Sequence, residues 1–137
     1  MQFTTVTTEQ CLDIRHEVLW PGLSRDECRL EEDDSALHFG ILHNGELVSC
    51  LSVFMSDDAT CQIRKFATRQ AFQGKGFGRY LFAQVIEKMQ ARGAKLIFLN
   101  ARISALAFYK KQGFITEGTP FYKRGVEFIR MTLRPAG

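Results

Sequence analysis

The chain places three glycines within five residues, in the stretch Gln73-Gly74-Lys75-Gly76-Phe77-Gly78. Glycines carry no side chain, so the backbone N–H groups of this stretch can approach a ligand closely. An amphipathic helix is predicted to follow directly, and N–H groups that open a helix present partial positive charge to an anion. Lys75 and Arg79 flank the turn and strengthen that attraction. The stretch therefore predicts a phosphate-binding turn, most naturally for a pyrophosphate.

Two commoner phosphate motifs do not match this stretch. The P-loop needs a longer spacer between its first glycine and a Gly-Lys-Ser/Thr ending. The dinucleotide fingerprint spaces its glycines differently and follows the first strand of a βαβ unit. The turn therefore belongs to a third kind of pyrophosphate site.

The segments on either side of the turn predict a strand, a long helix and a second strand. Residues 60–68 have the composition of a strand, and residues 95–100 form a short apolar strand. The helix between them carries one apolar stripe, made of Phe77, Leu81, Phe82, Val85, Ile86 and Met89. Gly93 is a natural C-cap. Because a helix separates the two strands, we expect them to pair in parallel through a right-handed crossover.

The rest of the chain predicts further strands around this unit. We expect a strand at 2–6, a helix capped by Thr7 or Thr8 that runs to Leu19, and a short helical turn in the acidic stretch 24–34. Strands 37–42 and 46–55 are joined at Asn44-Gly45, a strong hairpin signal. Ser104 can cap a helix at 105–112, and strands 114–116 and 125–133 close the sheet around the turn Gly118-Thr119-Pro120. The predicted fold class is α/β (α+β), a mixed sheet flanked by helices.

Composition restricts the function classes. The 137 residues fit one domain, 1–137, with 45% hydrophobic and 24% charged residues. A net charge of +3 without a dense basic block gives little support to nucleic-acid binding. The four cysteines are scattered without a CxxC pair or nearby paired histidines, so we expect reduced thiols, two or more of them buried, and no metal. No signal peptide or membrane-spanning run is visible, so the predicted location is cytoplasmic.

At this point the chain resembles a known family. The pattern Gln73-x-x-Gly76-x-Gly78 resembles the acyl-CoA signature of the GNAT superfamily of N-acetyltransferases. The segment from Ala105 to Phe114, which contains Tyr109 and Gly113, resembles a second element of that family. The tail at 121–131 is similar to that of bacterial members of the ElaA/YjcF-like type. Those relatives often carry a His at the position of Phe128, so acceptor chemistry that depends on that His is not carried over.

The resemblance implies a fold in which the central strands splay into a V and acetyl-CoA is the co-substrate. Main-chain amides of the turn would hold the pyrophosphate, and the pantetheine would lie along the fourth strand. A strand N–H, that of Phe66, would polarise the thioester carbonyl. The implied cofactor-binding residues are Lys65, Phe66, Ala67, Gln73, Gly74, Lys75, Gly76, Phe77, Gly78, Arg79 and Asn100. Arg64 is expected to point to the opposite face of the sheet from Lys65.

Tyr109 is the implied catalytic residue. A phenol is protonated at neutral pH and its acidity is near that of a thiol, so it can lend a proton to the departing CoA thiolate. The base for the amine is left open among six residues, which are Glu32, Asp33, Asp34, His38, Asp57 and Glu127. The acidic run 31–34 is expected to be a solvated loop that could attract a cationic acceptor. No cysteine shows a base or an oxyanion setting, so direct attack in a ternary complex is expected rather than a covalent acyl-enzyme.

Three alternatives remain at the level of sequence. A CoA-binding sensor or regulatory module would share the glycine turn without catalysis. A nucleic-acid binder would show salt-sensitive binding to DNA or RNA without competition by CoA. A binder of a different nucleotide would be saturated by ATP or NAD in place of CoA. The predicted partners are a small-molecule or peptide amine, without nucleic acid or membrane, and a homodimer through exposed strand edges is an expectation for this family. The identity of the acceptor and the acyl-chain preference stay undetermined.

Overall fold

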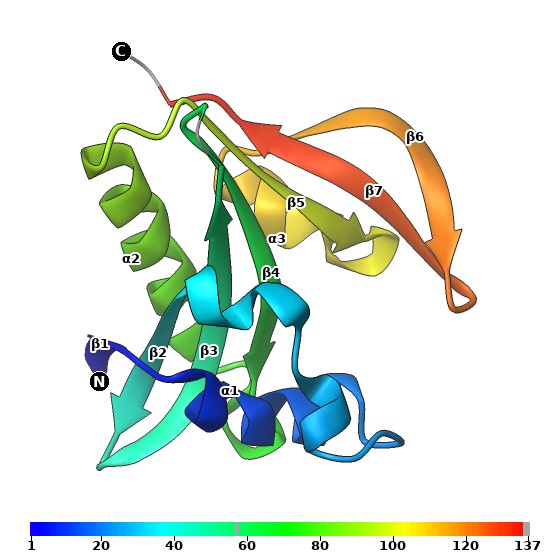
Figure 1. Cartoon of the computed structure of the whole chain (residues 1–137). Coiled ribbons are helices and arrows are strands. Elements are labelled where there is room, and N and C mark those ends of the chain that lie inside the picture. The colour runs from blue at the N-terminus through cyan, green and yellow to red at the C-terminus, as the bar shows by residue number, and fades with distance from the viewer. Residues whose placement is uncertain (57, 136–137) are drawn as a thin grey trace. The chain divides into compact units, whose positions relative to one another are not determined.

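The computed structural model of the chain describes residues 1–56 and 58–135. Within these residues seven strands form a mixed sheet flanked by helices, in the order β1-β2-β3-β4-β5-β7-β6 (Figure 1). The strands are β1 (Gln2–Thr5), β2 (Leu37–His43), β3 (Glu46–Met55), β4 (Thr60–Thr68), β5 (Leu96–Arg102), β6 (Ile115–Lys123) and β7 (Val126–Leu133). The α-helices are α1 (Thr8–Ile14), α2 (Phe77–Ala91) and α3 (Leu106–Lys111). The expected fold class is confirmed.

The chain divides into two compact units. The first unit is Met1–Phe54 with Ile63–Lys88, and the second is the described part of Met55–Gln62 and Met89–Gly137. Strand β4 and helix α2 each contribute residues to both units. The assignment of one domain to residues 1–137 stays a prediction.

Helix α1 begins where the sequence predicts. The hydroxyl of Thr7 accepts a hydrogen bond from the N–H of Gln10 at 3.2 Å. The side-chain oxygen of Gln10 in turn accepts one from the N–H of Thr7 at 2.9 Å. This capping box satisfies two donors that would otherwise lack a partner. The helical segment reaches Leu19 as expected, but its last part, Arg15–Leu19, is a π-helix. The N–H of Trp20 donates to the carbonyl of Arg15 at 2.9 Å. The wider last turn was not foreseen from sequence.

The hairpin at Asn44-Gly45 is confirmed. Asn44 has a φ of 52° and Gly45 a φ of 81°, the two positive values that a tight β2–β3 turn requires. His43 then pairs with Glu46, and the two strands are antiparallel.

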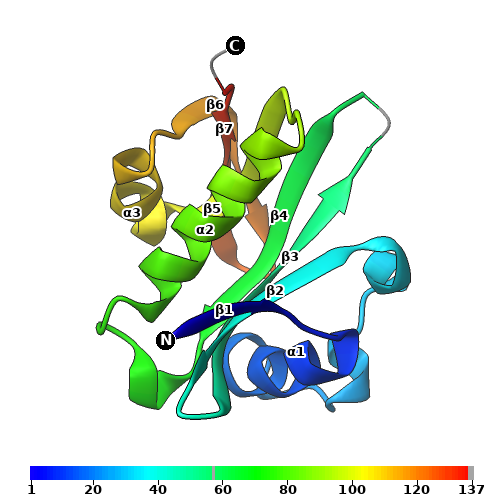
Figure 2. The same ribbon diagram turned by 90° about the vertical axis from the view of Figure 1, so that its left-hand side faces the viewer.

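The two faces of the first unit are covered by different helices. Cys50 of β3 and Ala67 of β4 pack in one apolar cluster with Cys11 and Ile14 of α1. Phe66 points to the other face, where its ring centroid lies 5.5 Å from that of Phe82 on α2. Figure 2 shows α1 and α2 on opposite sides of these strands. The face of each residue on β4 can therefore be read from the helix that it contacts.

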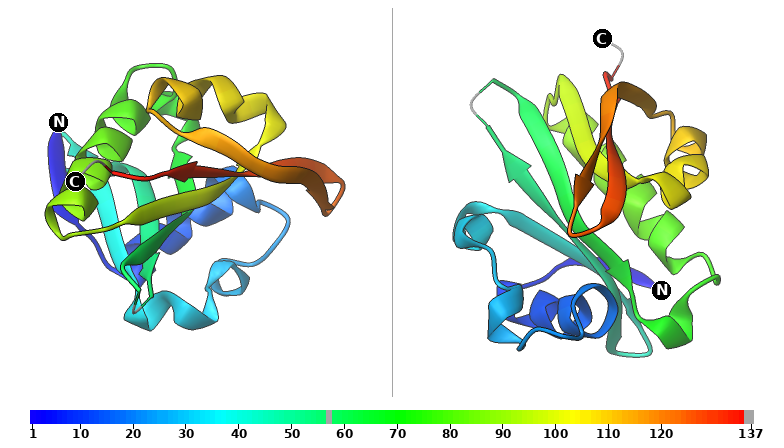
Figure 3. Two further views of the ribbon diagram at one scale, coloured as in Figure 1. Left: turned by 90° about the horizontal axis from the view of Figure 1, so that it is seen from above. Right: turned by 90° about the vertical axis from the view of Figure 1, so that its right-hand side faces the viewer.

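The second unit contains the predicted parallel pair and a long hairpin. Residues Thr60–Gln62 of β4 pair in parallel with Leu96–Phe98 of β5. Strand β7 then runs antiparallel to β5 and to β6, and Figure 3 shows the β6–β7 hairpin from two sides. The expected turn at Gly118-Thr119-Pro120 is wrong, because β6 runs through it with a register shift between Glu117 and Phe121. A strand at the edge of a sheet tolerates proline and a bulge, and the chain turns instead at Arg124 and Gly125, with φ of 53° and 77°.

Helix α3 begins later than predicted. Residues Ile103–Ala105 form a 3-10 turn, and α3 starts at Leu106 without a side-chain cap. The predicted cap by Ser104 is therefore wrong. Strand β5 continues to Arg102 instead of ending at Asn100, so Ser104 falls inside the 3-10 turn.

The four cysteines are free and buried, as expected. In the part of the chain that the structure describes, the helices are too short or too polar to cross a membrane.

Candidate active site

The glycine stretch forms the entry to α2 in the first unit. The first hydrogen bond of the helix runs from the N–H of Tyr80 to the carbonyl of Gly76, at 3.0 Å. The N–H groups of Gly76 to Arg79 precede that bond, and such groups have no partner within a helix. Gly74 and Gly76 have φ of 74° and 88°, values that favour glycine. The turn can therefore offer several main-chain donors to one anion.

Two cationic side chains lie at this turn. The Nη2 of Arg79 is 3.6 Å from the position that a Cβ on Gly76 would occupy, so the guanidinium folds back over the glycine. The Nζ of Lys75 is 5.9 Å from the ring centroid of Phe72. Both side chains are exposed. Their charge adds to that of the helix N-terminus, which suits a pyrophosphate.

Gly78 has a different role from Gly76. A Cβ on Gly78 would lie 3.0 Å from Oγ1 of Thr68 and 3.3 Å from Cζ of Phe66. The glycine thus lets α2 approach β4 closely. Gln73 supports the same arrangement, because its Nε2 donates to the carbonyl of Thr68 at 2.9 Å. The turn is therefore fastened to the end of β4.

Strand β4 has an irregular backbone conformation at Lys65. Lys65 has a φ of 58°, which is uncommon for a residue with a side chain and costs of order 1 kcal/mol. Phe66 and Ala67 follow on opposite faces, toward α2 and α1 respectively. Residues held in such sparsely populated conformations are common at active sites. Lys65 directly precedes Phe66, whose N–H the family resemblance implies as the thioester partner.

The side chains of Arg64 and Lys65 do not alternate between the two faces of the sheet as expected. The guanidinium carbon of Arg64 lies 5.2 Å from the ring centroid of Phe54, and its Nη1 is 3.9 Å from Glu32. The Nζ of Lys65 lies 3.7 Å from the ring centroid of Trp20. Phe54 lies four residues after Cys50 on β3, so the two side chains share one face of the strand. Trp20 directly follows the helical segment that covers this face. Both cations therefore project to the α1 face, and the prediction that they diverge is wrong.

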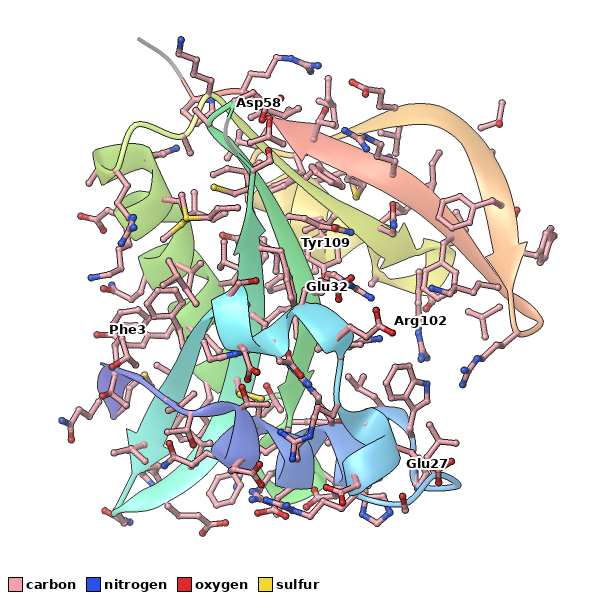
Figure 4. All side chains as sticks on the ribbon, in the orientation of Figure 1. Phe3, Glu27, Glu32, Asp58, Arg102 and Tyr109 are labelled. Carbon is pink, nitrogen blue, oxygen red and sulfur yellow. The ribbon has the colours of Figure 1, made fainter. Side chains whose placement is uncertain are left out.

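Tyr109 lies on α3 in the second unit, where Figure 4 labels it. Its ring packs edge-on to Phe108 at 5.1 Å and to Phe114 at 6.3 Å between centroids. Its carbonyl accepts hydrogen bonds from the N–H groups of Gln112 and Phe114, at 3.0 and 3.1 Å. The residue is partly buried and is held by the turn that ends the helix.

Burial raises the pKa of Tyr109 to about 12. The phenol therefore stays protonated at neutral pH, as a proton donor must. The expected match with the acidity of a thiol is not found, because removal from water disfavours the phenolate. The Tyr109 hydroxyl is therefore a hydrogen-bond donor and a weaker acid than the hydroxyl of an exposed tyrosine.

Asn100 lies on β5, opposite Arg130 of β7, with an exposed side chain. The chain therefore presents an amide at this point of the second unit. Its contact with a cofactor stays a prediction.

A buried ion pair removes one candidate base. Arg15 and Asp33 form two hydrogen bonds of 2.8 and 2.9 Å, and both side chains are essentially inaccessible to solvent. Burial opposes the charge of Asp33, but Arg15 and the N–H of Leu30 outweigh it and lower the pKa of that carboxyl. Asp33 is thus a structural anion, and the acidic run 31–34 is not wholly solvated as expected. Sequence reasoning missed the pair because its members are 18 residues apart.

His38 belongs to the same buried network. Its Nδ1 lies 2.6 Å from Oγ of Ser52, which also accepts a hydrogen bond from Arg15 at 3.1 Å. Its Nε2 lies 2.9 Å from the carbonyl of Asp33, an acceptor, so the ring carries its proton there. Both ring nitrogens are engaged, which makes His38 a structural residue.

A Ser52→Ala variant tests this interpretation of the network. The change leaves Arg15 and His38 each without one partner in a buried site, so we expect the free energy of unfolding to fall by about 2 kcal/mol. The catalytic rate at saturating substrate should stay within about twofold. Urea denaturation gives the first quantity and a thiol-release assay the second. As a control, Ser35→Ala removes an exposed hydroxyl that bonds to Glu32, and its stability should hardly change. A Ser52→Ala protein that is stable but slow would instead place His38 in catalysis.

The other described candidates for the base differ in their exposure and in their neighbours. Glu32 is exposed on the short helix η3 (Glu31–Ser35) and faces Arg64; Figure 4 labels it. Asp34 is exposed, and Glu127 pairs with Tyr122 in the β6–β7 hairpin. Asp57 lies outside the described residues. Glu32 is the candidate that lies beside Arg64, the residue before Lys65.

One cysteine, Cys11, has its pKa lowered by its neighbours, which sequence reasoning did not foresee. Hydrogen bonding to Cys50, and then to His38, lowers the pKa of the Cys11 thiol to about 6. Cys11 is nevertheless completely buried, in the cluster with Ile14 and Ala67. A thioester cannot reach it, so the arrangement still favours direct attack. Among the described residues no three His, Cys, Asp or Glu side chains are grouped as metal ligands.

Comparison with known proteins supplies the family. The model of the acetyltransferase (GNAT) domain matches residues 5–135. The N-acetyltransferase YitI of Bacillus subtilis, itself uncharacterized, is 25% identical over 134 residues, which cover 92% of this chain and 90% of YitI. A GNAT family acetyltransferase from Elizabethkingia anophelis, solved with acetyl-CoA bound, superposes with a TM-score of 0.78 at 19% identity and covers 98% of this chain and 97% of its own. Escherichia coli ElaA gives a TM-score of 0.75 at 18% identity, over 96% of this chain and 97% of ElaA.

Proposed function

The chain belongs to the GNAT acetyltransferase family, and from that premise we propose that it transfers an acetyl group from acetyl-CoA to a primary amine. The amine, of a small molecule or a peptide, attacks the thioester directly in a ternary complex. The observation that carries the proposal is the entry to α2, where the N–H groups of Gly76 to Arg79 precede the first helix bond and two cations stand beside them. The acetyl-CoA bound to the Elizabethkingia relative supports the choice of donor.

The geometry of the turn supports the proposed pyrophosphate contacts, and the other donor contacts are part of the same proposal. The pyrophosphate binds the amides from Gly74 to Arg79, helped by Lys75 and Arg79. Gln73 contributes by fastening the turn to Thr68. The pantetheine lies along Lys65, Phe66 and Ala67, and Asn100 hydrogen-bonds to it or to the acceptor. The N–H of Phe66, directly after Lys65, donates to the thioester oxygen.

The reaction balances without a covalent enzyme intermediate. The amine nitrogen bonds to the carbonyl carbon, and negative charge on the oxygen is stabilised by the N–H of Phe66. The carbon–sulfur bond then breaks, and the leaving thiolate accepts a hydrogen bond and a proton from Tyr109. The ammonium group formed by the attack loses its proton to solvent or to a carboxylate such as that of Glu32, and Tyr109 regains its proton from solvent. The products are an amide and free CoA.

Two measurements test this function together. Calorimetry should detect acetyl-CoA binding that ATP and NAD do not compete for, and a thiol-release assay across amine classes should show turnover. Binding without release from any amine would favour the alternative, a CoA-binding sensor or regulatory module. Salt-sensitive binding to DNA or RNA, indifferent to CoA, would overturn the proposal altogether. Gel filtration of the same protein decides whether it is a homodimer.

A further inference from the structure

Two neighbouring residues of β4 place their positive charges on one face of the sheet. Alternation along a strand would separate Arg64 from Lys65, but the positive φ of Lys65 brings both to the α1 face. Phe66 then points to the α2 face, beside Gly78 at the glycine turn. The two cations therefore lie across the strand from the turn that would hold the pyrophosphate, and next to the N–H that would hold the thioester.

Arg64 is paired more loosely than four other arginines of the first unit. Among the described residues, Arg15, Arg25, Arg29 and Arg69 each have a carboxylate oxygen at 2.6 to 2.8 Å. The carboxylate next to Arg64 is that of Glu32, at 3.9 Å, and the Glu32 side chain is 60% exposed. An exposed ion pair at this distance contributes little to stability. A second carboxylate can therefore take the place of Glu32 at small cost.

Lys65 is held in a fixed position. Its Nζ lies 3.7 Å from the ring centroid of Trp20, within the range of a favourable cation–π contact. The aromatic face orients the ammonium group beside Arg64 while both side chains stay partly exposed. With Glu32 included, this cluster of Arg64, Lys65 and Glu32 carries a net charge of +1.

We propose that Arg64 and Lys65 bind a carboxylate group of the acceptor, so that the substrate is an amine of the amino acid class. The inference rests on the proposed function, because the amine must reach a thioester held at Phe66. A guanidinium matches the two oxygens of a carboxylate in plane, and the ammonium of Lys65 adds a point charge. A polyamine or an aminoglycoside would bring like charge to the same face, which disfavours it.

The test compares each amino acid with its methyl ester in the thiol-release assay, with a polyamine and an aminoglycoside beside them. The ester keeps the amine and loses only the negative charge. Its amine is also less basic, so more of it is unprotonated at neutral pH and chemistry alone favours the ester. We expect the wild-type protein to prefer at least one free acid over its ester, by about tenfold or more in kcat/KM.

Variants of Arg64 locate that preference. Arg64→Gln should raise the KM for the acid by about tenfold to a hundredfold, the effect of losing a charge-assisted hydrogen bond. The KM for the ester and for acetyl-CoA should not change. Arg64→Lys should restore part of the loss. Arg29→Gln, which removes an exposed cation held by Glu9 at 2.6 Å, is the matched control and should behave as wild type.

The possible results distinguish the proposed carboxylate subsite from the proposed acetyl transfer. If amines are acetylated but the cationic or neutral ones are preferred, or if Arg64→Gln leaves the acid's KM unchanged, the carboxylate subsite is wrong and acetyl transfer stands. If acetyl-CoA binds and no amine in the panel releases thiol, both are wrong. A preference for the acid that Arg64→Gln abolishes supports the inference.

Discussion

A Tyr109→Phe variant is expected to turn over about a hundredfold to a thousandfold more slowly than the wild type, while it binds acetyl-CoA equally well. The change removes only the hydroxyl, which is the group proposed to donate to the departing thiolate, and general acid catalysis contributes of this order. The ring contacts with Phe108 and Phe114 remain, so the fold should persist. Steady-state kinetics and calorimetry measure the two quantities separately.

The pH profile provides an independent check on Tyr109. Since burial raises its pKa to about 12, the phenol holds its proton below that value and loses it only above. The wild-type rate should therefore show no decline from loss of this proton up to about pH 10. Tyr122→Phe, which alters an exposed tyrosine of β6, is the control and should leave the rate unchanged. A Tyr109→Phe protein with wild-type turnover would remove Tyr109 from the mechanism.

The second large effect is expected at the glycine turn. Gly76→Ala should weaken acetyl-CoA binding by about a hundredfold, the loss of one or two charge-assisted hydrogen bonds. Gly76 has a φ of 88°, where a side chain is strained, so the turn will shift and its N–H groups will no longer converge. Calorimetry with acetyl-CoA measures the effect directly.

Gly93 offers a matched control for the strain itself. It follows the other end of α2 with a φ of 89°, and an added Cβ would meet no heavy atom within 4 Å. The Gly93→Ala protein should therefore lose about as much stability as the Gly76→Ala protein, about 1 kcal/mol, with no change in acetyl-CoA binding. Equal binding by the Gly76→Ala and Gly93→Ala proteins would show that the turn does not hold the pyrophosphate.

Local signals in the sequence were sufficient for most elements of this fold. The Asn44-Gly45 hairpin, the Thr7 cap, the apolar stripe of α2 and the glycines at its entry each depend on residues a few positions apart. The chemistry of such a signal is complete within one turn or one hairpin, so it can be read without knowing the rest of the molecule. The glycine turn and the Tyr109 segment, taken together, also indicated the family.

The features that the sequence did not predict are formed by residues that lie far apart along the chain. The buried pair of Arg15 and Asp33 forms only once η3 packs on the α1 segment, and an acidic run by itself looks solvated. The passage of β6 through Gly118 to Pro120 depends on β7 beside it and on its place at the sheet edge. The positive φ at Lys65 occurs without a glycine, so no local signal in the sequence predicts it. The surrounding structure holds this strained conformation in place. Tertiary packing alone therefore decided which way Arg64 and Lys65 face, and with it the charge offered to an acceptor.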